Sequence, residues 1–234
     1  MSQADYIDIP VSDGTSLRAY VARPEGGGAH PGLMVFQEAF GVNEHIRDVT
    51  RRFAGEGYVA IAPELFHRTA PGFEGSYTDF GAVQPHMQAL TREGLTADIR
   101  ATYDWLINDP GVNRSAIASI GYCLGGSTSY LADATVPVQA SVSYYGGRIT
   151  EMLNLAGGLQ APILMFWGGL DKHIGPEKIQ AAEAAVREAG KTYANVVFSD
   201  ADHGFFCDVR ASYNPRAARE SWALTLSFLK DHLG

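Results

Sequence analysis

Short apolar runs alternate with amphipathic stretches along most of the chain. Continuous apolar runs are typical of strands buried on both faces of a sheet, and such runs predict strands at residues 32–37, 58–62 and 162–167; further strands are predicted at 116–120, 137–144 and 194–198. Apolar residues at helical spacing predict helices at about 43–57, 88–108, 125–131, 176–189 and 215–233. This alternation predicts an α/β fold with a mostly parallel central sheet and helices on both faces.

The remaining segments predict one hairpin and one long loop. Residues 6–11 and 17–21 alternate in polarity and predict two paired strands, with Pro10 confined to an edge strand. Residues 66–86 are rich in glycine, proline and aromatic residues without clear periodicity, which favours a loop, and loops of this length are often functional. Because no repeat or change of composition divides the chain, residues 1–234 are expected to form a single α/β domain.

Composition narrows the classes of partner and the compartment. The net charge of −8 makes nucleic acids and anionic membranes poor partners. No apolar run approaches the roughly 20 residues of a membrane span, and Met1–Asp5 lacks the basic and apolar pattern of a signal peptide. We therefore expect a cytoplasmic protein that is a monomer or a homodimer. Two cysteines, Cys123 and Cys207, are few for a disulfide scaffold, so we expect thiols.

The most informative motif is Gly121-Tyr122-Cys123-Leu124-Gly125-Gly126, which lies between a buried strand and a helix. It matches the nucleophile-elbow pattern Gly-x-nucleophile-x-Gly, with cysteine in place of serine. Such a sharp turn strains the backbone of the nucleophile and requires small neighbours. The helix N-terminus also favours a thiolate. A buried cysteine without chemistry is the alternative interpretation.

Two further residues follow their own strands in the order expected of an α/β-hydrolase, which is nucleophile, acid, base. Asp171 comes just after the strand at 162–167, and His203 comes just after the strand at 194–198. Both would lie at the carboxyl edge of the sheet with Cys123. Asp200 and Asp202 are rival acids, although their closeness in sequence to His203 makes contact with its outer ring nitrogen less natural. In this hypothesis Cys123 attacks a carbonyl, His203 transfers the proton and Asp171 orients the imidazole.

Stabilising the oxyanion requires two backbone donors. The amide of Leu124 is the first candidate, and the amide of Ala39, after the strand at 32–37, is the second. Glu38 is unusual at this place. Its carboxylate would oppose a nearby thiolate, could instead accept the thiol proton, or could pair with an arginine.

These motifs resemble the dienelactone hydrolase (carboxymethylenebutenolidase) family of the α/β-hydrolase superfamily. The resemblance covers essentially the whole chain and rests on residues 37–43, 62–66, 69–72, 121–126, 168–171 and 201–205. It implies a hydrolase that cleaves a small ester or lactone through a Cys123-His203-Asp171 triad and a thioester acyl-enzyme. It also implies that Glu38 contacts and activates the thiol, that the amides of Ala39 and Leu124 form the oxyanion hole, and that no cofactor is needed.

The chain departs from the family pattern at the substrate. Dienelactone hydrolases anchor the substrate carboxylate with arginines in the long loop and shortly after the catalytic histidine. Residues 69–91 contain no arginine here, and Cys207 occupies the second position. Arg68, Arg92 and Arg210 are nearby without matching by position. Tyr77 and Tyr145 are candidates to contact substrate through their hydroxyl groups.

Two other classes of function remain as hypotheses beside the hydrolase. One is a thiol-based binding or redox protein in which Cys123 reacts without acyl turnover, and the other is a catalytically silent scaffold. The histidines show no paired metal-ligand spacing, so we expect no metal. The natural substrate and the role of Cys207 stay open at this point.

Overall fold

The computed structural model describes residues 3–234, so Met1 and Ser2 of the stretch considered for a signal peptide lie outside the described residues. The described residues form two compact units, 3–118 and 119–234. In both units buried strands alternate with helices, and the expected α/β-hydrolase fold is confirmed. That all 234 residues act as a single domain stays a prediction.

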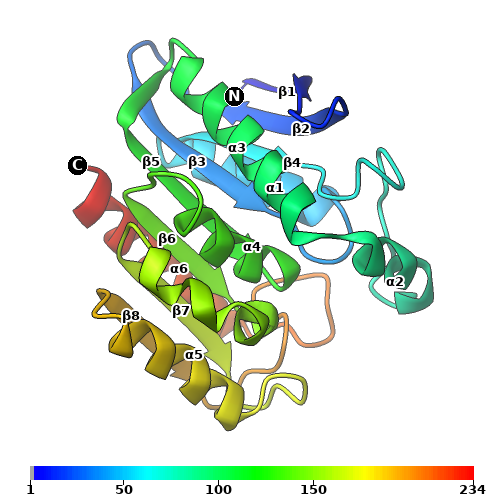
Figure 1. Ribbon diagram of the computed structural model, residues 1–234, viewed down its shortest axis with the longest axis vertical. Helices are drawn as coiled ribbons and strands as arrows, with labels where there is room; N and C mark the ends of the chain where they lie inside the picture. The colour runs from blue at the N-terminus through cyan, green and yellow to red at the C-terminus, as the bar shows by residue number, and fades with distance from the viewer. Residues whose placement is uncertain (1–2) are drawn as a thin grey trace. The chain divides into compact units, whose positions relative to one another are not determined.

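The first unit begins with the expected hairpin. Strands β1 (Gln3–Pro10) and β2 (Ser16–Arg23) are antiparallel, and β2 pairs with β4 (Val59–Pro63), which pairs in parallel with β3 (His30–Phe36). The order β1-β2-β4-β3 ends on β5 (Val112–Tyr122), which continues into the second unit. Helices α1 (Glu44–Gly55) and α3 (Arg92–Asn108) lie on opposite faces of these strands (Figure 1).

The second unit continues from β5 through parallel strands in the order β5-β6-β7-β8. Strands β6 (Ala140–Tyr144) and β7 (Ile163–Gly168) are wholly buried, and β8 (Tyr193–Phe198) is partly exposed. Helices α4 (Leu124–Asp133) and α5 (Pro176–Glu188) cover one face, and α6 (Pro215–Leu233) covers the other (Figure 1). The functional motifs of this unit all follow the carboxyl ends of its strands.

Capping residues explain where several helices begin. The side chain of Asn43 accepts a hydrogen bond from the Ile46 amide at the start of α1, at 3.2 Å. At the start of α6, Asn214 does the same for Ala217 at 3.1 Å, and Pro215 occupies the first turn. Such caps satisfy amide groups that the helix leaves without partners. The predicted bounds of α6 match the observed ones.

The expected loop at 66–86 was wrong in its second half, where α2 (Phe80–Ala89) forms. This helix escaped the sequence pattern because only Val83 is buried and Pro85 lies inside it. The helix predicted at 88–108 begins later, at Arg92, because Leu90 is extended and the side chain of Thr91 caps α3. Two short 3₁₀ helices, Gly147–Glu151 and Leu153–Gly158, were not expected either.

A buried carboxylate holds the loop that precedes β7. Asp133, at the end of α4, accepts hydrogen bonds from the Ser141 hydroxyl at 2.7 Å and from the amides of Gln160 and Ala161 at 2.7 and 2.9 Å. Burial raises the pKa of Asp133 above its ordinary value, against the lowering effect of these bonds. The carboxylate therefore ties α4, β6 and the following loop together.

Replacing Asp133 by alanine should lower the free energy of unfolding by about 2–4 kcal/mol, because buried donors would lose their acceptor. Asp133→Asn should cost less, since its amide oxygen still accepts. Urea unfolding measures both, with exposed Asp104→Ala as the control. An Asp133→Ala midpoint equal to that of Asp104→Ala would show that these bonds contribute nothing to stability.

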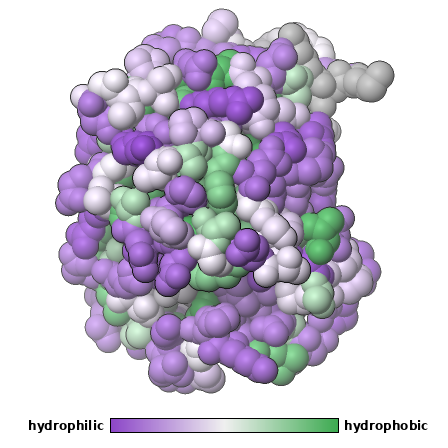
Figure 2. Space-filling view, turned by 90° about the vertical axis from the view of Figure 1, so that its right-hand side faces the viewer, coloured by the Kyte–Doolittle hydropathy of each residue, from purple (hydrophilic) through white to green (hydrophobic). Residues whose placement is uncertain are grey.

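The visible surface is mainly hydrophilic, and hydrophobic residues occur there in small groups (Figure 2). The large apolar side chains that are exposed are Phe80, Leu170, Val197, Val209, Tyr213 and Leu224. Isolated side chains of this kind are normal on soluble surfaces. Within residues 3–234, no helix combines the length and the apolar character that crossing a membrane requires.

Candidate active site

Cys123 lies on the strand-to-helix turn between β5 and α4. Its backbone has φ 56° and ψ −112°, a conformation rare for any residue other than glycine. The turn closes so tightly that a Cβ atom on Gly121 would lie 1.9 Å from the carbonyl oxygen of Gly125. The glycine at 121 is therefore a steric requirement of the elbow, as the motif predicted.

Backbone hydrogen bonds fix this turn in place. The amide of Cys123 donates to the Tyr144 carbonyl at 3.0 Å, and the Cys123 carbonyl accepts from the Gly126 amide at 3.1 Å. Leu124 is the first residue of α4, so its amide has no partner within the helix. The thiol of Cys123 is half-buried, and the role of the Leu124 amide toward an oxyanion stays a prediction.

The side chains of Asp171 and His203 meet directly. Nδ1 of His203 lies 2.7 Å from Oδ2 of Asp171, and the side chain of His203 is also hydrogen-bonded to Cys123. The other carboxylate oxygen of Asp171 accepts from the amides of His173 and Ile174 at 2.8 and 3.1 Å. The structure thus brings together the three residues that the sequence put forward as a triad.

The two rival acids have other partners. Asp202 accepts a hydrogen bond from the backbone amide of His203 at 2.7 Å, which supports the loop without reaching the ring nitrogen. Asp200 forms an ion pair with Arg216. Of the three candidate acids, Asp171 is the one whose carboxylate contacts the imidazole ring of His203.

Glycines let the two loops approach each other. A Cβ atom on Gly168 would lie 2.6 Å from the Ala201 carbonyl oxygen, and one on Gly169 would lie 2.7 Å from the Ser199 Cα. The amide of Leu170 also donates to the Ala201 carbonyl at 2.9 Å. This close packing of backbones, which sequence reasoning did not find, sets the spacing of Asp171 and His203. The Gly-Gly pair before Asp171 was its only sequence signal.

The charges in this group support one another. Burial by itself would lower the pKa of His203, but the thiolate charge of Cys123 and the hydrogen bond to Asp171 raise it to about 10. Burial likewise disfavours ionisation of Asp171, yet its hydrogen bonds with His203 and the loop amides lower its pKa. The arrangement therefore favours the imidazolium form of His203 beside the Asp171 carboxylate.

Glu38 and Ala39 lie in the first unit, on the segment that follows β3, and both are buried. The neighbouring side chain of Gln37 donates to the Glu38 carbonyl at 3.1 Å and accepts from the Leu65 amide at 3.0 Å. Gln37 thereby joins the ends of β3 and β4 and fixes the backbone of this segment. The roles of Glu38 and Ala39 toward Cys123 stay predictions.

The two tyrosines considered for substrate contact differ in their surroundings. Tyr77, in the first unit, is half-buried, packs on Phe40 with ring centroids 4.6 Å apart, and accepts a hydrogen bond from Asn43 at 2.9 Å. Tyr145, in the second unit, is fully buried, and its ring lies 5.0 Å from that of His203. Substrate contact by either hydroxyl stays a prediction.

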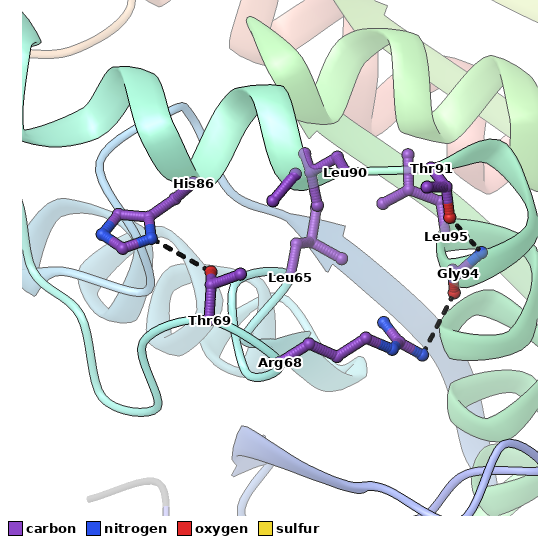
Figure 3. Close-up of a pocket in the computed structure, with 9 residues that line it drawn as sticks. Leu65, Arg68, Thr69, His86, Leu90, Thr91, Gly94 and Leu95 are labelled. Atoms are coloured by element: carbon purple, nitrogen blue, oxygen red, sulfur yellow. Dashed lines mark hydrogen bonds between the residues drawn. The ribbon is translucent and has the colours of Figure 1, made fainter.

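A small pocket beside the start of α3 contains Arg68 (Figure 3). Its volume of about 30 Å³ accommodates only a few water molecules. Arg68 binds both carboxylate oxygens of buried Asp98 at 2.8 Å and Asp13 through Nε at 2.8 Å. The charge of Arg68 is therefore already neutralised within the first unit.

Residues 17–233 match the family model described as the dienelactone hydrolase family. The chain belongs to the dienelactone hydrolase family. The predicted resemblance is thereby confirmed.

Relatives of this dienelactone hydrolase family member span nearly its full length. A protein of Synechocystis sp. described as "Putative carboxymethylenebutenolidase" is 36% identical over 226 residues, which are 92% of each chain. A protein of Escherichia coli strain K12 with the same description is 36% identical over 247 aligned residues, covering 99% of this chain and 88% of the relative. A crystal structure titled "Putative Dienelactone Hydrolase" from Klebsiella pneumoniae matches with a TM-score of 0.89 and 33% identity, covering 98% of this chain and 99% of that one.

Membership of the dienelactone hydrolase family indicates an ester or lactone hydrolase of the carboxymethylenebutenolidase type that acts on small molecules.

Arg210 follows the position at which the family pattern expects an arginine, and its side chain packs against the loop that carries His203. A Cβ atom on Gly204 would lie 2.4 Å from Nη1 of Arg210, so the guanidinium packs on the residue after His203. Cys207, at the expected arginine position, is buried and forms no disulfide with Cys123.

Proposed function

We propose that this protein hydrolyses small esters or lactones with Cys123 as nucleophile, His203 as proton carrier and Asp171 as the residue that orients it. The observation that carries the proposal is the position of His203, bonded to Asp171 at 2.7 Å on one side and to Cys123 on the other. A base within hydrogen-bond reach of the nucleophile, itself oriented by a third group, is the geometry of nucleophilic catalysis.

In the first half of the reaction, the Cys123 thiolate attacks the substrate carbonyl carbon. The carbonyl π electrons move to the oxygen, and the amides of Leu124 and Ala39 stabilise the resulting oxyanion. When the tetrahedral intermediate collapses, the carbon–oxygen bond to the leaving group breaks and the His203 imidazolium donates its proton to that oxygen. The products of this half are a thioester on Cys123 and an alcohol or enol; for a lactone, both remain in one molecule.

In the second half, neutral His203 takes a proton from a water molecule, whose oxygen attacks the thioester carbonyl. Collapse of this intermediate releases the carboxylic acid and restores the thiolate and imidazolium pair. Glu38 is proposed to contact the Cys123 thiol in the resting enzyme and to help activate it once substrate displaces the Glu38 carboxylate. The thiol proton then passes to His203, which becomes the imidazolium of the first half. Tyr77 and Tyr145 are the proposed hydroxyl contacts to substrate, and no cofactor takes part.

The pH dependence follows from the raised pKa of His203, which lies at about 10. The imidazolium persists below that pH and is lost above it, so kcat/KM for esters with poor leaving groups should fall above about pH 10. Asp171→Asn removes one of the contributions that raise this pKa, so the alkaline limb should move to lower pH. Rate measurements across pH 6–11 on a phenyl and an alkyl ester check both results, since the better leaving group depends less on the proton.

Trapping the acyl-enzyme tests the proposal. After mixing with a short aryl ester, intact-protein mass spectrometry should show a transient acyl adduct that peptide mapping places on Cys123. In Cys123→Ser the adduct should form much more slowly, and in Cys207→Ser it should form at the normal rate. A stable adduct without release of acid would support the binding or redox alternative, and turnover with no adduct on Cys123 would refute the assignment.

The substrate class is tested with matched lactones. Arg68 is neutralised by Asp98 and Asp13, so no preference for anionic substrates is expected from it. A panel of dienelactones with a carboxylate, neutral lactones and short aryl esters measures kcat/KM for each. A strong preference for the carboxylated lactone would assign the anion-binding role to another cation, for which Arg210→Gln is the first variant.

A further inference from the structure

The turn that ends β6 contacts both the nucleophile and the histidine of the candidate site. The carbonyl of Tyr144 accepts the hydrogen bond from the Cys123 amide at 3.0 Å, and the amide of the next residue, Tyr145, donates to the Phe166 carbonyl of β7 at 2.7 Å. The same turn then brings the Tyr145 ring to 5.0 Å from the ring of His203, with an interplanar angle of 59°. Two adjacent residues thus link Cys123 and His203 through one rigid segment.

The backbone of Tyr145 is strained in this turn. Among residues 3–234, Cys123 and Tyr145 are the non-glycine residues with positive φ, at 56° and 40°. This conformation is unfavourable for a bulky side chain and persists only where surrounding structure enforces it. Strain of this kind clusters at functional sites. Here the strained residue Tyr145 faces His203, which is the hydrogen-bond partner of the strained residue Cys123.

The ring of Tyr145 is locked from several sides. It is fully buried, and it meets Phe205 at 5.3 Å, Tyr144 at 6.1 Å and Tyr122 at 6.4 Å between ring centroids. His203 is held on its Nδ1 side by Asp171, and its ring also faces exposed His173, 6.1 Å away. The Tyr145 ring therefore presents a fixed aromatic surface to the imidazole.

We propose that Tyr145 is a positioning residue that keeps the His203 imidazolium beside Cys123 by packing its aromatic ring against it. An aromatic ring within about 6 Å of a cation attracts it through the ring quadrupole. The contact therefore favours the charged imidazolium and fixes its plane. This inference rests on the proposed function of His203, and it assigns the positioning of the imidazolium to the Tyr145 ring, separately from the substrate contact proposed for the Tyr145 hydroxyl.

The test measures how alkylation of Cys123 by iodoacetamide depends on pH, because that rate reports the thiolate that pairs with His203. Tyr145→Phe keeps the ring, and its alkylation profile should match the wild type, whereas loss of a hydroxyl contact to substrate would change KM. Tyr145→Leu removes the ring, and the midpoint of its profile should rise by roughly 0.5–1 pH unit. Its kcat should fall by about 3–10-fold, with KM little changed.

Tyr130→Leu is the matched control, since Tyr130 is another fully buried tyrosine of this unit and its loss should leave the alkylation profile in place. If Tyr145→Leu does not fold, Tyr145→Met fills the space with a flexible side chain and serves instead. An unchanged profile in the folded Leu or Met variant would overturn the inference, and so would a shifted alkylation profile in Tyr145→Phe. If hydrolysis proves independent of Cys123, the proposed function fails, whereas the alkylation profile still reports on Tyr145.

Discussion

Replacement of Cys123 by alanine should abolish ester hydrolysis, with a loss of about 10⁴-fold or more in kcat/KM. Removing the nucleophile of a triad removes the covalent route altogether, and what remains is the contribution of binding and the oxyanion donors. The strained backbone at 123 is equally accessible to alanine and cysteine, so the fold should persist. Steady-state rates on a short aryl ester measure the loss, and circular dichroism checks the fold.

The second cysteine supplies the control for this experiment. Cys207 is buried on the loop after His203, and Cys207→Ala removes only one sulfur atom from it. This variant should keep its rate to within a few-fold. Full activity in Cys123→Ala together with loss in Cys207→Ala would move the nucleophile to Cys207 and refute the proposed mechanism.

Gly121→Ala should damage the site through the backbone alone. The added methyl group would lie 1.9 Å from the Gly125 carbonyl oxygen and 2.2 Å from its carbon, so the elbow must open. Overpacking of this kind typically costs about 1–3 kcal/mol or more, and a displaced nucleophile loses about 100-fold in rate. Urea unfolding and kcat/KM measure the two effects.

Gly157→Ala provides the matched substitution, because a Cβ atom at Gly157 would meet nothing within 4 Å. That variant should be neutral in both measurements. A Gly121→Ala enzyme with normal activity and stability would mean that the turn can relax, and that its tightness is not what places Cys123.

The sequence predicted those parts of the fold that local pattern determines. Apolar runs located the buried strands, and Asn214-Pro215 with its periodic helix located α6 at its observed bounds. Strand β5 begins earlier than predicted, at Val112. Residues 113–115 are exposed and polar, so the apolar run used for the prediction starts only after them. Helix α2 was missed because a solvent-exposed helix carries little apolar periodicity, although Asp79 at its N-cap was a usable signal.

The candidate site divides in the same way. The sequence was enough to propose Cys123, Asp171 and His203 as a group, because each of them follows a predicted strand. The choice between Asp171 and Asp202 needed the approach of two loops, which is a tertiary property. The strained backbone of Tyr145 had no sequence signal, since tyrosine does not favour positive φ and the neighbours that enforce it are distant in the chain.

The saturation of Asp171 has a consequence for how charge moves during turnover. Its two oxygens accept from His203 and from the amides of His173 and Ile174. Because both oxygens of this carboxylate already accept hydrogen bonds, it acts as a fixed counterion and does not itself take up a proton. In the proposed cycle, His203 gives one proton to the leaving-group oxygen and takes another from water while the charge of Asp171 stays constant, so His203 can reverse its role from acid to base without any rearrangement of the loop.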